Sequence, residues 1–183
     1  MNLVWTACIA LILVSCSIFP AGWKTPVLDG LQSNNIRAVY LVSGIGLLSS
    51  QELENSPEIL VVHTFKDFQK VATQNRVALW IDKDVLQIVD SNWLHREPQK
   101  YCPLAVLGYN EPLFVFGEKL SGFDIEGTGI SWSSKNLGPG YSVWMLKEDG
   151  ETFMHGYSCE PTVEGLQLVT YSLLDGKAWK RCP

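Results

Sequence analysis

The chain has 183 residues, of which 46% are hydrophobic and 18% are charged, with 19 acidic side chains against 14 basic ones. This length fits one globular domain, and the apolar and aromatic content excludes a disordered chain. The net charge of −5 argues against nucleic acid as a partner, because such binding needs Lys and Arg to neutralise phosphates. The first charged residue is Lys24, so an uncharged leader precedes an acidic domain.

The leader contains an uncharged apolar run from Leu3 to Val14, which has the length of a signal-peptide core. The uncharged stretch continues to Trp23 but is interrupted by Pro20 and Gly22. Since a transmembrane helix needs about 20 apolar residues, a membrane span is marginal here.

The apolar run ends in Leu13-Val14-Ser15-Cys16. This segment resembles the lipobox of bacterial lipoprotein precursors, which has an aliphatic residue three positions before the cysteine and a small residue directly before it. The resemblance implies cleavage before Cys16 and lipidation of its thiol, which would anchor the chain on the extracytoplasmic face of the cell membrane. Met1-Asn2 lack the Lys or Arg that normally opens such a signal. An uncleaved N-terminal anchor and ordinary secretion are the two alternatives.

These features predict three segments: a signal peptide at 1–15, a lipidated cysteine with a tether at 16–32, and a single domain at 33–183. The tether is broken by prolines and glycines and shows no hydrophobic period. An irregular, aromatic-rich part of the domain begins at about residue 121.

Three cysteines follow the tether, namely Cys102, Cys159 and Cys182. We expect a Cys159–Cys182 disulfide, because it would fix the C-terminal tail and because disulfides form outside the cytosol. Three unpaired thiols are the alternative, since spacing alone does not determine connectivity. No Cys/His spacing indicates a metal site, so we expect neither a metal nor a cofactor.

Several apolar runs predict strands, at 36–43, 58–63, 77–81, 104–107 and 113–116. Between them, Ser49 and Thr64 begin segments with the spacing of helix capping boxes. Asp82 can cap a third helix, whose apolar residues recur at helical spacing as far as Trp93.

The C-terminal third begins with a stretch rich in Gly, Ser and Asn at 121–140. Segments 141–147 and 152–159 then flank an Asp-Gly pair, which predicts a hairpin. Segment 166–174 fits a strand or a short helix, and we favour a strand. The whole pattern predicts an α/β fold: a small, mainly parallel sheet with flanking helices (a β-α-β-α-β core) and an antiparallel C-terminal hairpin.

Sites in such sheets lie beyond the carboxyl ends of the parallel strands. The residues predicted at that edge are Ser43, Gly44, Gly46, His63, Thr64, Asp82, Lys83, Asp84, Tyr109, Asn110 and Glu111.

Two chemical patterns occur among these residues. Gly44 and Gly46 are spaced as in a dinucleotide-binding loop, but Ser49 replaces its third glycine and His63 replaces its ribose-binding acid, so a simple glycine turn is favoured. Ser43, His63 and Asp82 supply a nucleophile, a base and an orienting acid from three strand ends. They are weak catalytic candidates, because no Gly-x-Ser-x-Gly elbow surrounds Ser43.

The aromatic residues fall into two groups. We expect Trp80, Trp93, Phe114 and Phe116 in the core. A second group crowds the C-terminal third and comprises Trp132, Tyr141, Trp144, Phe153, Tyr157 and Trp179. This group forms either a contact surface or a second small core under the hairpin, and we favour the core.

The sequence therefore predicts a membrane-anchored lipoprotein that acts as a binding or interaction module in the bacterial envelope. Its expected partners are the membrane, through the lipid, and an envelope protein or small ligand. One alternative is an envelope hydrolase that uses Ser43, His63 and Asp82. Another is a structural accessory protein without a small-molecule site.

Overall fold

A computed structural model describes residues 35–74, 76–96, 103–120, 137–146 and 152–175. The chain divides into two units, Met1–Gln32 and Ser33–Pro183, and every described residue belongs to the second. The leader, Cys16 and the tether lie outside the described residues.

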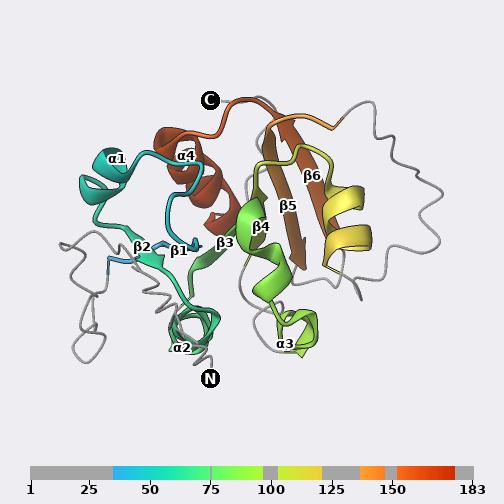
Figure 1. Cartoon of the computed structure of the whole chain (residues 1–183), viewed down its shortest axis with the longest axis horizontal. Helices are drawn as coiled ribbons and strands as arrows, with labels where there is room; N and C mark the ends of the chain where they lie inside the picture. Colours follow the sequence, from blue (N-terminus) through green and yellow to red (C-terminus); the bar gives the residue numbers. More distant parts are fainter. Residues whose placement is uncertain (1–34, 75, 97–102, 121–136, 147–151, 176–183) are drawn as a thin grey trace, which may run out of the picture. The chain divides into compact units, whose positions relative to one another are not determined.

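The second unit is built on a six-stranded sheet with the strand order β2-β1-β3-β4-β5-β6 (Figure 1). The first four strands along the chain are parallel, and β5 and β6 form an antiparallel hairpin beside β4. The strands are β1 (Ala38–Leu41), β2 (Ile59–Val62), β3 (Ala78–Asp82), β4 (Leu104–Leu107), β5 (Gly140–Leu146) and β6 (Thr152–Ser158). The predicted α/β class, the mainly parallel sheet and the antiparallel hairpin are confirmed.

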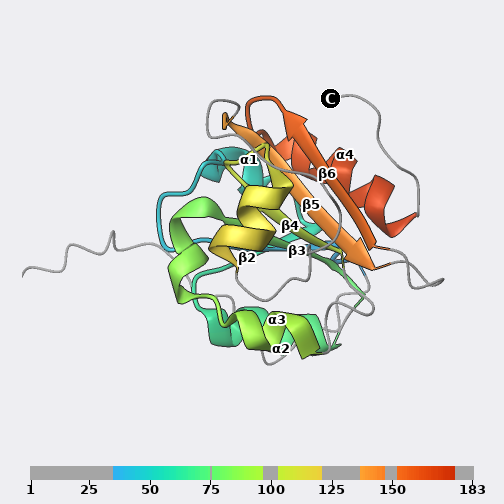
Figure 2. The same cartoon turned by 90° about the vertical axis from the view of Figure 1, so that its right-hand side faces the viewer.

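Helices cover both faces of this sheet (Figures 1 and 2). One face carries α1 and α4, and the other carries α2 and α3. The helical segments are α1 (Ser50–Glu54), α2 (Phe65–Gln74), the 3-10 helix η2 (Lys83–Ile88), α3 (Ser91–Arg96), the π-helix η4 (Phe114–Lys119) and α4 (Val163–Leu174). No helix in the described ranges is long and apolar enough to cross a membrane.

The predicted helix caps are present. The hydroxyls of Ser49 and Thr64 each accept a hydrogen bond from the backbone N–H three residues on, and Asp82 accepts one from the N–H two residues on. The helix predicted to continue from Asp82 to Trp93 is instead divided into η2 and α3. Asp90 caps α3 with its own carboxylate, so a second N-cap interrupts what the apolar spacing suggested was one helix.

The strand predicted at 113–116 was wrong, because the structure has the π-helix η4 there. The buried side chains Val115, Phe116 and Leu120 lie at helical spacing, and the Leu120 N–H donates to the Val115 carbonyl at 2.8 Å. The short apolar run before Leu120 is ambiguous between strand and helix, since periodicity needs a longer window.

The strand favoured at 166–174 was also wrong, and the alternative helix is the structure that forms. α4 starts at Thr162, whose hydroxyl accepts a hydrogen bond from the Gly165 N–H at 3.0 Å. The buried residues Leu166, Val169 and Leu173 recur at helical spacing and face the sheet. The β-branched and aromatic residues of this run are typical of strands. The helix forms instead because it packs its apolar face on the sheet.

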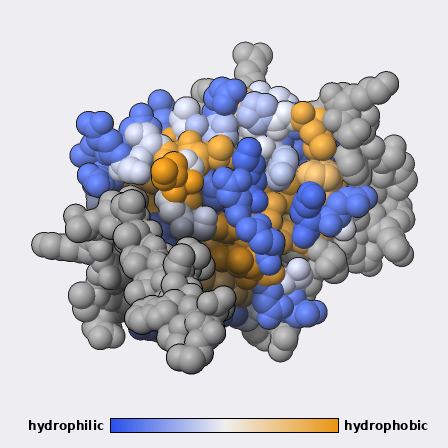
Figure 3. Space-filling view, viewed as in Figure 1, coloured by the Kyte–Doolittle hydropathy of each residue, from blue (hydrophilic) through white to orange (hydrophobic). Residues whose placement is uncertain are grey.

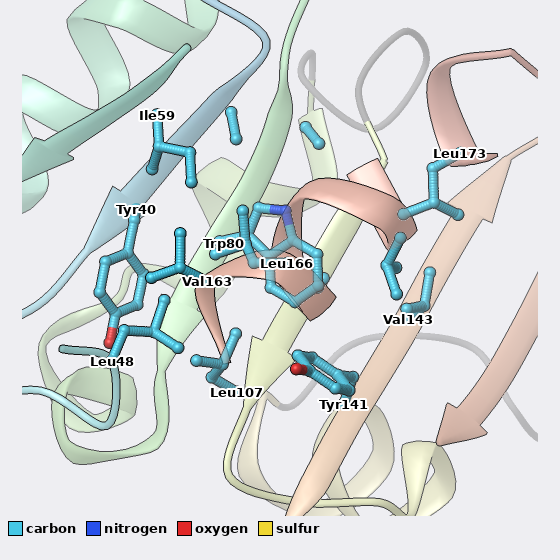
Figure 4. Packing of buried hydrophobic residues seen from close by; sticks show 14 of the residues in the cluster. Tyr40, Leu48, Ile59, Trp80, Leu107, Tyr141, Val143, Val163, Leu166 and Leu173 are labelled. Atoms are coloured by element: carbon cyan, nitrogen blue, oxygen red, sulfur yellow. The ribbon is translucent and has the colours of Figure 1, made fainter. Parts of the chain in front are cut away.

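The core between the sheet and α4 is centred on Trp80, which lies beneath Leu166 and beside Tyr141 in Figure 4. The Trp80 indole donates to the Thr170 hydroxyl at 2.8 Å, and its ring meets the Tyr141 ring edge-on with centroids 5.7 Å apart. This hydrogen bond satisfies a buried polar group that would otherwise destabilise the core.

The described aromatic residues of the C-terminal third belong to the interior. Tyr141, Trp144 and Tyr157 are buried and Phe153 is half-buried. Tyr141, Tyr157 and Phe153 join the main core under α4 rather than forming a separate small core. Trp132 and Trp179 lie outside the described residues. The contact surface that these aromatics could have formed therefore finds no support in the described part of the chain.

Candidate functional site

The carboxyl ends of β2, β1, β3 and β4 lie side by side along one edge of the sheet, because these strands are parallel and adjacent. The chain leaves β1 toward β2 on one side, whereas β3 and β4 lie on the other side. The carboxyl ends of β1 and β3 therefore form the topological switch point, where α/β sheets commonly bind ligands. Residues 43–46, which follow β1 there, are called the switch-point loop below.

Asp82 ends β3 at this switch point, and its side chain is buried. Its Oδ2 accepts hydrogen bonds from the Tyr40 hydroxyl and from the Leu47 N–H, the latter at 2.9 Å. Its Oδ1 accepts one from the Asp84 N–H at 3.1 Å. Both oxygens thus have donors, as a buried carboxylate requires. One side chain joins β1, the segment after β1 and the start of η2.

Tyr40 lies on β1 with its ring fully buried. Burial raises the pKa of its phenol well above the ordinary value, and the hydrogen bond to Asp82 and the negative charge of that carboxylate raise it further. The phenol therefore remains a neutral donor to Asp82 and is unsuited to act as a base.

Gly46 brings the backbone directly over this Tyr–Asp pair. A Cβ atom at Gly46 would lie 2.6 Å from the Tyr40 hydroxyl and 2.5 Å from a methyl group of Val42. Only glycine fits this approach, which explains its place in the loop better than a phosphate-binding role does. The protein's own groups fill the space at the carboxyl ends of β1 and β3.

Ser43 and His63 follow β1 and β2 at the same edge of the sheet, and neither donates the hydrogen bonds that Asp82 accepts from Tyr40, Leu47 and Asp84. Ser43 is exposed, and His63 is half-buried with its Nδ1 2.9 Å from the Val42 carbonyl oxygen. The hydrogen bonds of Asp82 go to Tyr40 and to two backbone N–H groups, and none of them orients His63. Asp82 therefore stabilises a loop, whereas a triad would need its carboxylate on the imidazole.

The predicted residues Thr64, Lys83 and Asp84 also take structural positions. Thr64 caps α2, and the backbone N–H of Asp84 binds Asp82. The Lys83 stem lies so close to Gly108 that a Cβ there would be 2.5 Å from it. Gly108 also has φ +101°, a left-handed conformation that favours glycine at the turn after β4.

The residues after β4 connect this edge to the C-terminal hairpin. The Asn110 amide donates to the Ser158 hydroxyl at 2.8 Å, and its Oδ1 accepts from the Gly138 N–H at 2.9 Å. The Ser142 hydroxyl donates to the carbonyl of Tyr109 at 2.8 Å. These partners are far apart in the sequence, so no local pattern could have indicated them.

Ile45 is the one large apolar side chain in the described ranges that is almost wholly in water, at 97% exposed. It lies on the switch-point loop beside Gly44. A Cβ atom added at Gly44 would have no neighbour within 4 Å, so the space around this part of the loop is open. Figure 3 shows apolar surface over the segment between β1 and α1, bordered by hydrophilic side chains. The sequence indicated a glycine turn at this place but did not indicate that its apolar residue projects outward.

Of the four cysteines from Cys16 onward, Cys159 is the one within the described ranges. Cys159 is disulfide-bonded, whereas Cys16, Cys102 and Cys182 lie outside the described residues, so its pairing with Cys182 stays a prediction. Within the described ranges, no group of three His, Cys, Asp or Glu side chains could hold a metal ion.

No protein-family model, curated protein or solved structure matches the chain.

Replacing Asp82 with alanine should lower the free energy of unfolding by about 3 kcal/mol, because the Tyr40 hydroxyl and the Leu47 N–H would lose their buried acceptor. Urea unfolding followed by tryptophan fluorescence measures the loss. Asp84→Ala is the matched control, since Asp84 is exposed and only its backbone binds Asp82. The control should change stability by less than about 0.5 kcal/mol. Equal losses in the two variants would contradict the role given to Asp82.

The Tyr40 phenol should also make stability depend on alkaline pH. The unfolded chain releases this proton near pH ~10, whereas the folded chain keeps it. Tyr40 thus contributes its full share to the free energy of unfolding below pH ~10. Above that pH, this contribution falls by up to about 1.4 kcal/mol for each pH unit. The stability difference between wild type and Tyr40→Phe, measured by urea unfolding between about pH 8 and 11, should therefore shrink above pH ~10. The other tyrosines are common to both proteins, so a constant difference would refute this assignment.

Proposed function

We propose that this chain is a lipid-anchored protein on the extracytoplasmic face of a bacterial membrane, where its domain binds an envelope protein. The segment Leu13-Val14-Ser15-Cys16 at the end of the apolar leader carries the proposal. The disulfide at Cys159 supports it, because structural disulfides persist outside the reducing cytosol. The tether at 17–32 would give the domain a reach of at most ~55 Å from the lipidated residue.

A protein partner fits the switch point better than a small ligand does. A small ligand needs a concave site with free polar groups, whereas here Gly46, Tyr40 and Asp82 pack against one another at the switch point. Ile45 projects from the loop above it. A protruding apolar side chain suits insertion into a pocket of another protein, where burial would contribute about 1.5–3 kcal/mol.

The loop is also prepared for such a contact. The Leu47 N–H bond to Asp82 fixes one end, and the packing of Gly46 against Tyr40 fixes the backbone beside Ile45. A side chain presented from a fixed backbone loses less conformational entropy on binding than one on a free loop does. The buried Asp82 network thus supports an interaction role for the surface above it.

Changing Cys16 to alanine should prevent lipidation and move the protein out of the membrane fraction. Metabolic labelling with a radioactive fatty acid, followed by membrane fractionation, measures both effects. Cys8→Ala is the matched control, because Cys8 belongs to the segment that cleavage would remove. A wild-type protein without the fatty-acid label, or a Cys16→Ala protein that keeps the label, would contradict lipidation at Cys16.

A photoreactive amino acid placed at Ile45 should cross-link the chain to a different protein in intact cells. Ile88 is the matched control position, because it is also an exposed isoleucine, at 47%, on the helix η2 that follows β3. We expect an adduct of increased mass from position 45 and none from position 88. Adducts at both positions, or at neither, would argue against Ile45 as the contact.

A further inference from the structure

The two edges of the sheet differ in length and protection. The edge strand β2 has four residues, whereas β6 at the other edge has seven. Exposed edges of natural sheets are usually short, or are protected by charged residues, proline or a bulge, because they can pair with another chain. The β6 sequence TFMHGYS contains no charged residue and no proline. This edge thus lacks the common sequence features that prevent pairing.

The sheet register shows which backbone groups β6 directs outward. The Gly108 N–H donates to the Gly140 carbonyl at 2.9 Å, so Gly140 directs its backbone N–H and C=O groups toward β4. In antiparallel strands, successive residues direct their backbone N–H and C=O groups to opposite sides. Val143, three residues after Gly140, therefore directs these groups toward β6, where it pairs with His155. His155 is therefore bonded to β5, and its neighbours Met154 and Gly156 direct their N–H and C=O groups away from the sheet.

The outward groups of Met154 and Gly156 form no hydrogen bond with any residue in the described ranges. Two other contacts nevertheless hold the β6 strand in place. It pairs with β5 along its whole length, and the backbone of Asn110 approaches Gly156 so closely that a Cβ there would lie 1.9 Å from the Asn110 carbonyl oxygen. A fixed strand with open donors and acceptors is a template for one more strand.

We propose that this strand is supplied by a second copy of the chain, with the two β6 strands antiparallel about a two-fold axis at His155. In this register Met154 lies opposite Gly156 of the second copy and exchanges both backbone hydrogen bonds with it. Phe153 lies opposite Tyr157, and the two His155 residues face each other with Cα atoms about 4.5 Å apart. The inference does not depend on the proposed lipid anchor.

Self-complementarity favours a second copy over an unrelated strand. A two-fold contact requires that one surface match itself. The β6 sequence has this symmetry, because an aromatic residue lies two positions before His155 and another lies two positions after it. The rings are already ordered as a row, since His155 stacks on Phe153 with centroids 6.0 Å apart and meets Tyr157 at 4.4 Å. Aromatic cross-strand pairs would add to the backbone bonds.

Cysteine cross-linking tests the register in the full-length protein. His155→Cys should form a disulfide between two copies under mild oxidation, giving twice the chain mass on a non-reducing gel. Met154→Cys is the matched control, because its copy would lie more than about 7 Å away, beyond the reach of a disulfide. A monomer, or an adduct of His155→Cys with a different protein, would overturn the proposal.

A backbone variant tests the same contact without new thiols. Met154→Pro removes an outward N–H and no bond to β5, since proline is tolerated where the N–H of an edge strand faces solvent. Light scattering of the detergent-solubilised full chain should show a dimer whose dissociation constant rises about tenfold or more in Met154→Pro. Circular dichroism should be unchanged, which shows that the fold is retained. A wild-type chain that is monomeric at all concentrations would also overturn the proposal.

Discussion

The buried carboxylate of Asp82 organises the carboxyl edge of the parallel strands. A charge removed from water is stable only if fixed donors surround it, and here those donors come from β1, from the segment after β1 and from η2. Because one group must satisfy all three, the end of β3, the loop path and the start of the 3-10 helix are fixed together. The neutral Tyr40 phenol and the absence of a side chain at Gly46 are requirements of the same arrangement.

This requirement changes how the switch point should be interpreted. Several residues predicted at this edge hold the chain in place: Asp82 binds the segment after β1, Thr64 caps α2 and Asn110 joins the β4 end to β6. Among the large apolar side chains of the described ranges, Ile45 on the loop above them is the one that is almost wholly exposed. Fold alone would have suggested a ligand pocket here, and the interaction surface that we propose instead depends on this side chain.

Local signals in the sequence predicted most of the described fold. Ser49 and Thr64 could be identified as caps because a cap depends on residues within one turn. The four parallel strands could be identified because each is a short apolar run between turn residues. The run before Leu120 and the run after Thr162 were assigned wrongly, since a few apolar residues suit a strand or a helix equally until packing selects one. The residues predicted at the carboxyl edge of the parallel strands lie at that edge, but the hydrogen bonds of Asp82 and Asn110 join residues far apart in the sequence and could not be predicted.

The amino-acid sequence alone establishes an uncharged N-terminal stretch as far as Trp23, an acidic excess in the chain after it, and an alternation of strand and helix patterns that predicts an α/β sheet. These properties follow from composition and from short-range periodicity. The folded domain decided that Asp82 supports a loop, that Ile45 projects from it, and that β6 ends the sheet with Met154 and Gly156 directed outward. The physical reason is that burial and hydrogen-bond partners depend on which distant segments pack together, and neither is encoded in the neighbours of a residue along the chain.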